Sequence, residues 1–196
     1  MKNMQNKYAQ NLEMLARQKG QERLQYVIAE HGHGSDEAHQ AQDDMHYAAQ
    51  TLAAIESGAP TRCAFAQEKI YMPDWEEGHP TIGYEESLAR FHDAEGNALA
   101  PKDIFPALGR LGLTDYADAR IVHIIAKEAA QRDPQAPPLG VNIMPKSLED
   151  PEFRAYVENA LSQHGEHVKH RLVVEITEMG ELHPDSIEWL KTMRAK

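Results

Sequence analysis

The chain has 196 residues, a net charge of −11 and a hydrophobic content of 41%. The acidic balance argues against binding to a nucleic-acid polymer, but it allows a small anionic ligand that is held by a local cation or a bound metal. No apolar run is long enough to span a bilayer, and the N-terminus lacks the apolar core of a signal peptide. Cys63 is the single cysteine, which fits a reducing compartment, so we expect a cytoplasmic protein.

Residues 1–60 are predicted to form a helical N-terminal arm. A first helix is expected from about residue 4 to 30, with Gly20 as a candidate break point. A turn at residues 31–34 follows this helix. The apolar residues of the second helix recur at spacings of three and four, as on one face of an amphipathic helix. These residues are Ala41, Met45, Ala48, Leu52 and Ile55. We interpret the arm as a hairpin that packs on the following domain, on a partner or in a homodimer.

From residue 61 on, short apolar runs alternate with helical patterns. This alternation is typical of an α/β fold in which helices cover a parallel sheet. The predicted strands cover residues 63–71, 81–88, 139–144 and 171–177, and the predicted helices begin at residues 101, 115, 151 and 184.

Polar side chains interrupt three of the predicted strands. Glu86 lies near the end of the second strand, Asn142 in the middle of the third and Glu175 inside the last. A buried amide must form hydrogen bonds or coordinate an ion, and a buried charge is costly unless it is paired or bound to metal. Oxygen ligands at the carboxyl ends of successive strands can build a hard-metal site in an α/β barrel. The alternatives are a solvent-facing Glu86 and a Glu175 that is paired with an arginine or lysine.

Four strings of the chain, in this order, resemble the motifs of the EAL family of cyclic-di-GMP phosphodiesterases. Glu86-Ser87-Leu88-Ala89-Arg90 resembles the family's Glu-Ala-Leu-x-Arg, with Ser in place of Ala. Pro101-Lys102-Asp103-Ile104-Phe105-Pro106 resembles Pro-x-x-Phe-Ile-Pro. Val141-Asn142-Ile143-Met144-Pro145 resembles Val-Asn-x-Ser-Pro, and Glu175-Ile176-Thr177-Glu178 resembles Glu-x-Thr-Glu.

The resemblance implies a modified TIM barrel in which Glu86, Asn142 and Glu175 bind Mg²⁺ or Mn²⁺. It also implies metal-assisted attack of water on a phosphodiester of cyclic-di-GMP, which would yield the linear dinucleotide.

The resemblance further assigns four residues around the substrate. Gln67, Leu88 and Arg90 would bind cyclic-di-GMP, and the guanidinium of Arg90 would offer a bidentate match to a phosphate. Glu178 would belong to the catalytic group by steadying the loop over the site.

The family's next motif, Asp-Asp-Phe-Gly, should follow one helix after Glu178, and the chain ends in that helix. A TIM barrel has eight strands and about 250 residues, whereas residues 61–196 contain about four predicted strands. We therefore expect an incomplete, TIM-barrel-like EAL domain, represented by its first half, that is inactive on its own. The explanations left open are a fragment of a longer product, a natural truncation and a barrel completed by another chain.

Two further hypotheses are open. The chain could be a non-catalytic EAL module that binds cyclic-di-GMP or a protein partner. A histidine metal site in the N-terminal arm, made of His31, His33, His39 and His46, is the other hypothesis, because histidine is a common zinc ligand.

Overall fold

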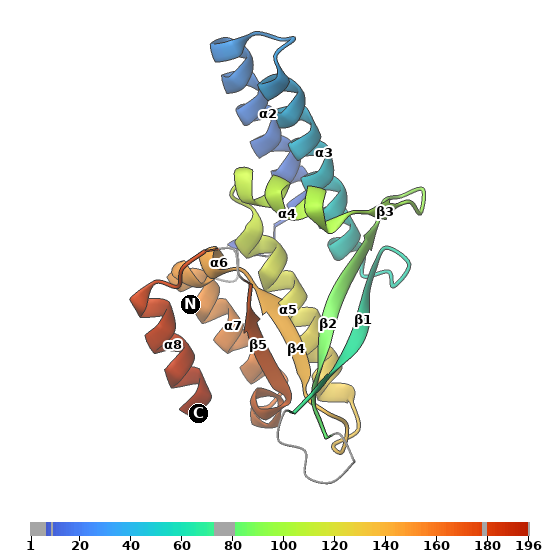
Figure 1. The fold of residues 1–196 in the computed structure, drawn as a ribbon, viewed down its shortest axis with the longest axis vertical. Coiled ribbons are helices and arrows are strands. Elements are labelled where there is room, and N and C mark those ends of the chain that lie inside the picture. The colour runs from blue at the N-terminus through green and yellow to red at the C-terminus, as the bar shows by residue number, and fades with distance from the viewer. Residues whose placement is uncertain (1–6, 9, 73–80, 178–179, 196) are drawn as a thin grey trace. The chain divides into compact units, whose positions relative to one another are not determined.

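The computed structural model describes residues 7–8, 10–72, 81–177 and 180–195 (Figure 1). The chain divides into two compact units. The first comprises the residues up to Ala64 together with Ala89–Ala117, and the second comprises Phe65–Leu88 and the residues from Asp118 on. Strand β2 (Ile82–His92) and helix α5 (Thr114–Gln131) contribute residues to both units. The predicted domain boundary at residue 60 stays a prediction.

The first unit contains the predicted helical hairpin, made of α2 (Leu12–His31) and α3 (Asp36–Ser57), which lie side by side in Figure 1. The break expected at Gly20 does not occur. The helix continues because Gly20 faces Met45 of α3, and a Cβ atom at Gly20 would lie only 2.4 Å from the Met45 Cβ. Glycine is therefore used here for close helix packing and not for a turn.

A buried ion pair links the hairpin to α4 (Pro101–Arg110), a helix of the same unit. Asp44 is completely buried, and Arg110 donates to its two carboxylate oxygens from Nε at 2.7 Å and from Nη2 at 2.6 Å. Arg23 of α2 places its Nε 4.0 Å from the same carboxylate. One carboxylate thus connects three helices, although its sequence context shows no sign of it.

The sheet has the strand order β1-β2-β4-β5, and most of it belongs to the second unit. The short β3 (Ala98–Leu99) pairs with the end of β2 at Phe91 and His92, within the first unit. Strands β4 (Leu139–Ile143) and β5 (Leu172–Ile176) are parallel to each other, and β4 is parallel to β2. The predicted α/β fold with a partial sheet of about four main strands is confirmed.

The expectation of a parallel sheet holds for β2, β4 and β5 but is wrong for β1 (Cys63–Tyr71), which forms an antiparallel hairpin with β2. At one end of the hairpin, the Met72 amide donates to the Thr81 carbonyl at 3.0 Å, and at the other the His92 amide donates to the Arg62 carbonyl at 2.8 Å. The connection from β1 to β2 spans residues 72–81, which is too short for a parallel crossover.

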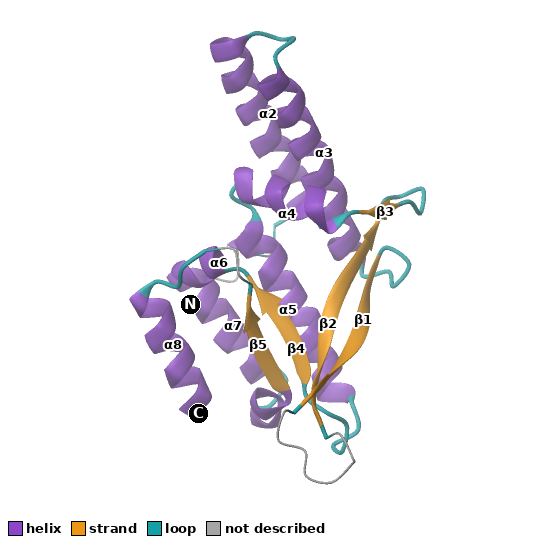
Figure 2. Ribbon diagram, in the orientation of Figure 1, coloured by secondary structure: helices purple, strands orange, loops and turns teal. Residues whose placement is uncertain are grey.

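Helices cover one face of the sheet. Leu139, Val141 and Ile143 alternate along β4 and are at most 1% exposed. Val141 and Ile143 line the same cavity as Val122 of α5 and Val157 of α7 (Pro151–Gln163), so both helices pack over this face (Figure 2). The remaining elements of the unit are α6 (Pro145–Glu149), the 3-10 helix η1 (Glu166–Arg171) and α8 (Pro184–Ala195).

Each helix in the described part of the chain is either too short or too polar to cross a membrane.

The ion pair of Asp44 yields a prediction on stability. We expect Asp44→Asn to lower the free energy of unfolding by about 2 kcal/mol, less than the loss typical of a fully buried pair, because the Arg110 side chain is 38% exposed. Asp43→Asn, which changes the exposed neighbouring residue, is the matched control. Urea unfolding followed by circular dichroism measures both variants, and equal stabilities would contradict the anchoring role of Asp44.

Candidate metal centre

The sheet brings the three predicted metal ligands together. The register pairs Glu86 with Gly140, and Asn142 with Glu175. Because side chains alternate along a strand, all four positions lie on one face of the sheet, opposite to the helix-covered face. The Asn142 Nδ2 donates to the Glu86 Oε1 at 2.7 Å. Two carboxylates and one amide from three adjacent strands therefore converge.

The Glu175 carboxylate lies in an unfavourable environment. Burial raises its pKa above the ordinary value, a hydrogen bond from Tyr84 acts in the opposite direction, and the nearby Glu86 raises it further. Its Oε1 is buried and has no hydrogen-bond partner among the residues that the structure describes. A buried acceptor without a donor costs free energy, and a bound cation would remove that cost.

The donor set fits a hard divalent cation. Carboxylate and amide oxygens are ligands of Mg²⁺ and Mn²⁺, and the orphaned oxygen of Glu175 faces the same side as Glu86 and Asn142. Within the described ranges, no three His, Cys, Asp or Glu residues form a group that could hold a metal. The third donor of this site is thus the Asn142 amide, and the four histidines of the N-terminal arm do not gather.

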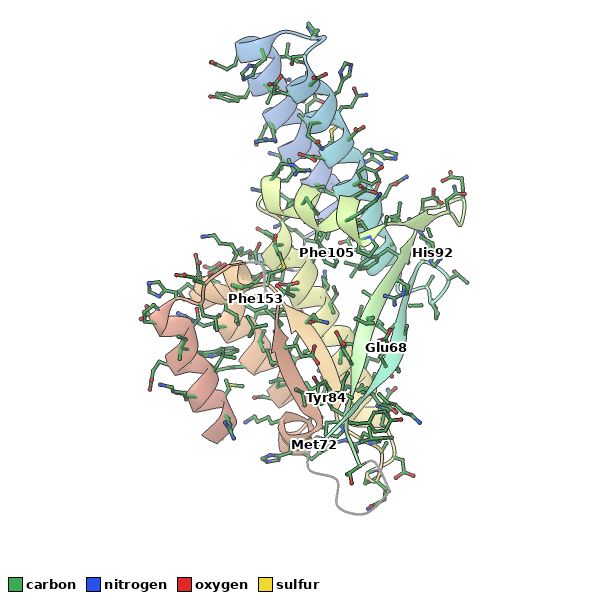
Figure 3. The ribbon with its side chains drawn as sticks, viewed as in Figure 1. Glu68, Met72, Tyr84, His92, Phe105 and Phe153 are labelled. Carbon is green, nitrogen blue, oxygen red and sulfur yellow. The ribbon has the colours of Figure 1, made fainter. Side chains whose placement is uncertain are left out.

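Two residues of this face were not singled out from the sequence. Tyr84, labelled in Figure 3, precedes Glu86 by two positions in β2, and Gly140 is the register partner of Glu86. A Cβ atom on Gly140 would lie 2.9 Å from the Tyr84 Cε2 and 3.1 Å from the Glu175 Oε1. The hydrogen bond to Glu175 is the main cause that raises the pKa of Tyr84 to about 12. A glycine inside a strand is a known sign of close approach and could have indicated this contact.

Asp118 of α5 supports the chain just beyond Asn142 and was also missed. Its side chain is buried, and its Oδ2 accepts hydrogen bonds from the Met144 amide at 3.0 Å and from the Ser147 hydroxyl at 2.6 Å. Since this carboxylate holds the turn from β4 into α6, it fixes where the strand that carries Asn142 ends. The sequence did contain one sign of this role, which is an acidic residue next to the apolar positions of a predicted helix.

Of the other predicted site residues, Gln67 lies on the opposite face of the sheet from Glu86. The exposed Gln67 accepts a hydrogen bond from Ser87 Oγ at 3.3 Å and contacts Glu128 of α5 at 3.5 Å, on the helix-covered face. Leu88 is half-buried and follows Glu86 by two positions in β2, so it lies on the same face of the sheet. Arg90 is exposed and belongs to the first unit. Glu178 lies outside the described residues. The roles given to these four residues stay predictions.

The sequence profile of the EAL domain matches residues 71–196, which is more than half of the chain. The chain belongs to the EAL family. The predicted resemblance is therefore confirmed, while a comparison with curated proteins gives no match.

Solved structures of EAL proteins have a similar fold. The S helix–GGDEF–EAL region of Vibrio cholerae LapD bound to c-di-GMP has a TM-score of 0.63 at 18% identity, covering 78% of this chain and 35% of that one. Its apo form has a TM-score of 0.57 at 19% identity, covering 68% and 30%. The Xanthomonas citri FimX EAL domain in complex with c-di-GMP has a TM-score of 0.57 at 15% identity, covering 82% and 58%. The EAL chain thus spans less than two thirds of these proteins.

The unfavourable environment of the Glu175 carboxylate leads us to predict that removing its charge stabilises the protein in a pH-dependent way. Because its folded pKa is raised, the native state binds the proton more readily, and wild-type stability falls as the pH rises through the window above the ordinary value of 4.5. Without added metal at neutral pH, we expect Glu175→Gln to raise the melting temperature by about 2–4 °C, equivalent to about 1 kcal/mol. Calorimetry should show the gain disappear below pH 4.5, and a loss of stability at neutral pH would contradict this account.

The role of Asp118 predicts a second effect. Replacing Asp118 with Asn removes a charged acceptor from the buried Ser147 hydroxyl and from the partly buried Met144 amide, and we expect the free energy of unfolding to fall by about 2 kcal/mol. Asp185→Asn, at a carboxylate that is 75% exposed, is the control. Chemical denaturation measures both, and a change within error for Asp118→Asn would rule out the support inferred for the β4–α6 turn.

Proposed function

We propose that this EAL chain binds a divalent cation and cyclic-di-GMP as part of a phosphodiesterase domain. The observation that carries the proposal is the convergence of Glu86, Asn142 and Glu175 on one sheet face in a member of the EAL family. The similarity to LapD and FimX structures that contain c-di-GMP supports the choice of ligand. The free thiol of Cys63 is consistent with a cytoplasmic location, which belongs to the same proposal.

The residues of the site divide into two groups. Glu86, Asn142 and Glu175 would hold Mg²⁺ or Mn²⁺, which when bound supplies Lewis acidity toward a phosphate oxygen. Arg90 would bind a phosphate through its bidentate guanidinium, with Leu88 as a further substrate contact and Glu178 steadying the loop over the site. Gln67 is left out of this group, because its contacts lie on the helix-covered face of the sheet. In the reaction, a water oxygen would bond to phosphorus as the water loses a proton, one P–O ester bond would break, and the leaving alkoxide oxygen would take up a proton and become the free hydroxyl, which opens the ring.

The number of carboxylates agrees with this assignment. Glu86 and Glu175 repel each other when both are ionised, and burial adds to the cost for Glu175. A structural role alone does not require two carboxylates side by side on one sheet face, whereas a divalent cation neutralises both. The proposal therefore explains why the sheet face contains charges that disfavour the metal-free fold.

Isothermal titration calorimetry tests the proposal. We expect cyclic-di-GMP to bind the wild-type chain at least tenfold more tightly with Mg²⁺ than without it, and we expect Glu86→Gln to remove this difference. Glu188→Gln, at a glutamate that is 76% exposed on α8, is the matched control. If neither condition gave binding, the proposed ligand would be wrong.

Chromatography of the same mixtures separates the two EAL hypotheses. Formation of the linear dinucleotide would identify a phosphodiesterase in the chain itself, while cation-dependent binding without product would identify a binding module or an incomplete catalytic site. Binding that is unaffected by Glu86→Gln would place the ligand elsewhere on the molecule.

A further inference from the structure

We propose that Tyr84 is a positioning residue of the cation site, which holds the Glu175 carboxylate over Gly140 so that it faces Glu86 and Asn142. This inference rests on the proposed cation site and adds to it a residue that touches no cation. It does not depend on cyclic-di-GMP or on its hydrolysis.

The register of the strands places Tyr84 and Glu175 on either side of Gly140. Glu86 is the partner of Gly140, and Tyr84 stands two positions before Glu86 in β2. Glu175 is the partner of Asn142, which stands two positions after Gly140 in β4. Tyr84 therefore reaches Gly140 from the amino-terminal side of the strands, and Glu175 reaches it from the carboxyl-terminal side.

The contact over Gly140 is close on both sides. A Cβ atom on Gly140 would be 2.9 Å from the Tyr84 Cε2, 3.0 Å from its Cδ2 and 3.1 Å from the Glu175 Oε1. Carbon atoms in contact are normally about 3.5–4.0 Å apart. Any side chain at Gly140 would thus have to displace the ring, the carboxylate or both. The missing side chain creates the space in which the phenol and the carboxylate meet.

The phenol is suited to hold this carboxylate. A tyrosine hydroxyl is a hydrogen-bond donor, and the Tyr84 side chain hydrogen-bonds to Glu175. A neutral donor stabilises a carboxylate without neutralising it, so Glu175 keeps the negative charge that a cation needs. Without this donor, the repulsion from Glu86 would turn the Glu175 carboxylate away from the other ligands.

Cation binding distinguishes positioning from packing. Tyr84→Phe keeps the ring and its contact with Gly140 but removes the hydroxyl, so a role in packing alone would leave the affinity for Mn²⁺ unchanged. We expect the affinity, measured by electron paramagnetic resonance of free Mn²⁺, to fall by about tenfold to a hundredfold, as for other residues that orient a metal ligand. Tyr26→Phe, at a tyrosine of α2 that is 66% exposed, is the matched control.

A second variant and a second signal complete the test. Gly140→Ala keeps every ligand and donor but places a methyl group between Tyr84 and Glu175, and we expect a similar loss of Mn²⁺ affinity. Terbium replaces Mn²⁺ as a hard cation with luminescence that a nearby tyrosine sensitises, so tyrosine-excited emission should appear in the wild type and disappear in Tyr84→Phe. Circular dichroism confirms that each variant is folded. If Tyr84→Phe does not fold, the wild-type emission decides: bound terbium without tyrosine-sensitised emission would overturn the role of Tyr84.

Each result decides the inference. Mn²⁺ affinity in folded Tyr84→Phe equal to that of the wild type would overturn the role of Tyr84 and leave the cation site intact. No Mn²⁺ binding by the wild type would overturn the cation site and this inference together. Mn²⁺ binding by the wild type that Tyr84→Phe and Gly140→Ala both weaken, while Tyr26→Phe does not, would support it.

Discussion

The candidate site depends on the register of β4 between β2 and β5. The side chains of a strand alternate between its two faces, so a shift of one residue in the register would turn Asn142 toward the helices and Ile143 toward the site. The apolar residues Leu139, Val141 and Ile143 prevent this shift, because they are buried under the helices. Hydrophobic burial on one face of the sheet thus determines which polar side chains meet on the other.

This arrangement has a cost that the surrounding residues reduce. Glu175 is partly buried beside Glu86, and its Oε1 has no hydrogen-bond partner in the described part of the chain. The Asn142 amide donates to Glu86, and the phenol of Tyr84 donates to Glu175. Each carboxylate therefore has one neutral donor, which lowers the cost of the charge without removing the charge. Such a partial compensation is typical of sites whose charges serve a ligand.

Local periodicity made part of this structure predictable. The apolar stripe of α3 is buried at Ala41, Ala48, Leu52 and Ile55, as its spacing indicates. Asn142 and Glu175 could be singled out because each interrupts an apolar strand, and they are indeed register partners. A polar residue in an apolar run carries its own signal, since its burial must be explained by a partner.

Contacts between distant segments were not predictable in the same way. The link from Asp118 to Ser147 joins residues on two elements, and the sequence of one element does not show which residue of another element its polar side chain will contact. Gly20 and Gly140 both permit a close approach of another side chain, whereas a glycine in sequence suggests a break or turn first. The antiparallel direction of β1 follows from its short connection to β2. The alternation of strands and helices along the sequence does not by itself reveal this direction.

The same charges couple the stability of the EAL chain to the cation that we propose. Without a cation, the repulsion between Glu86 and Glu175 lowers the stability of the native state, because the unfolded chain separates the two carboxylates. A cation that binds only the native state adds stability that grows with its concentration relative to Kd. Tyr84 and Asp118 affect stability in different ways. Tyr84 hydrogen-bonds to the side chain of the proposed ligand Glu175, whereas Asp118 holds the backbone just beyond the proposed ligand Asn142. Loss of the Asp118 support should therefore reduce stability with or without a cation, whereas loss of the Tyr84 hydroxyl should reduce mainly the part of the stability that the cation adds.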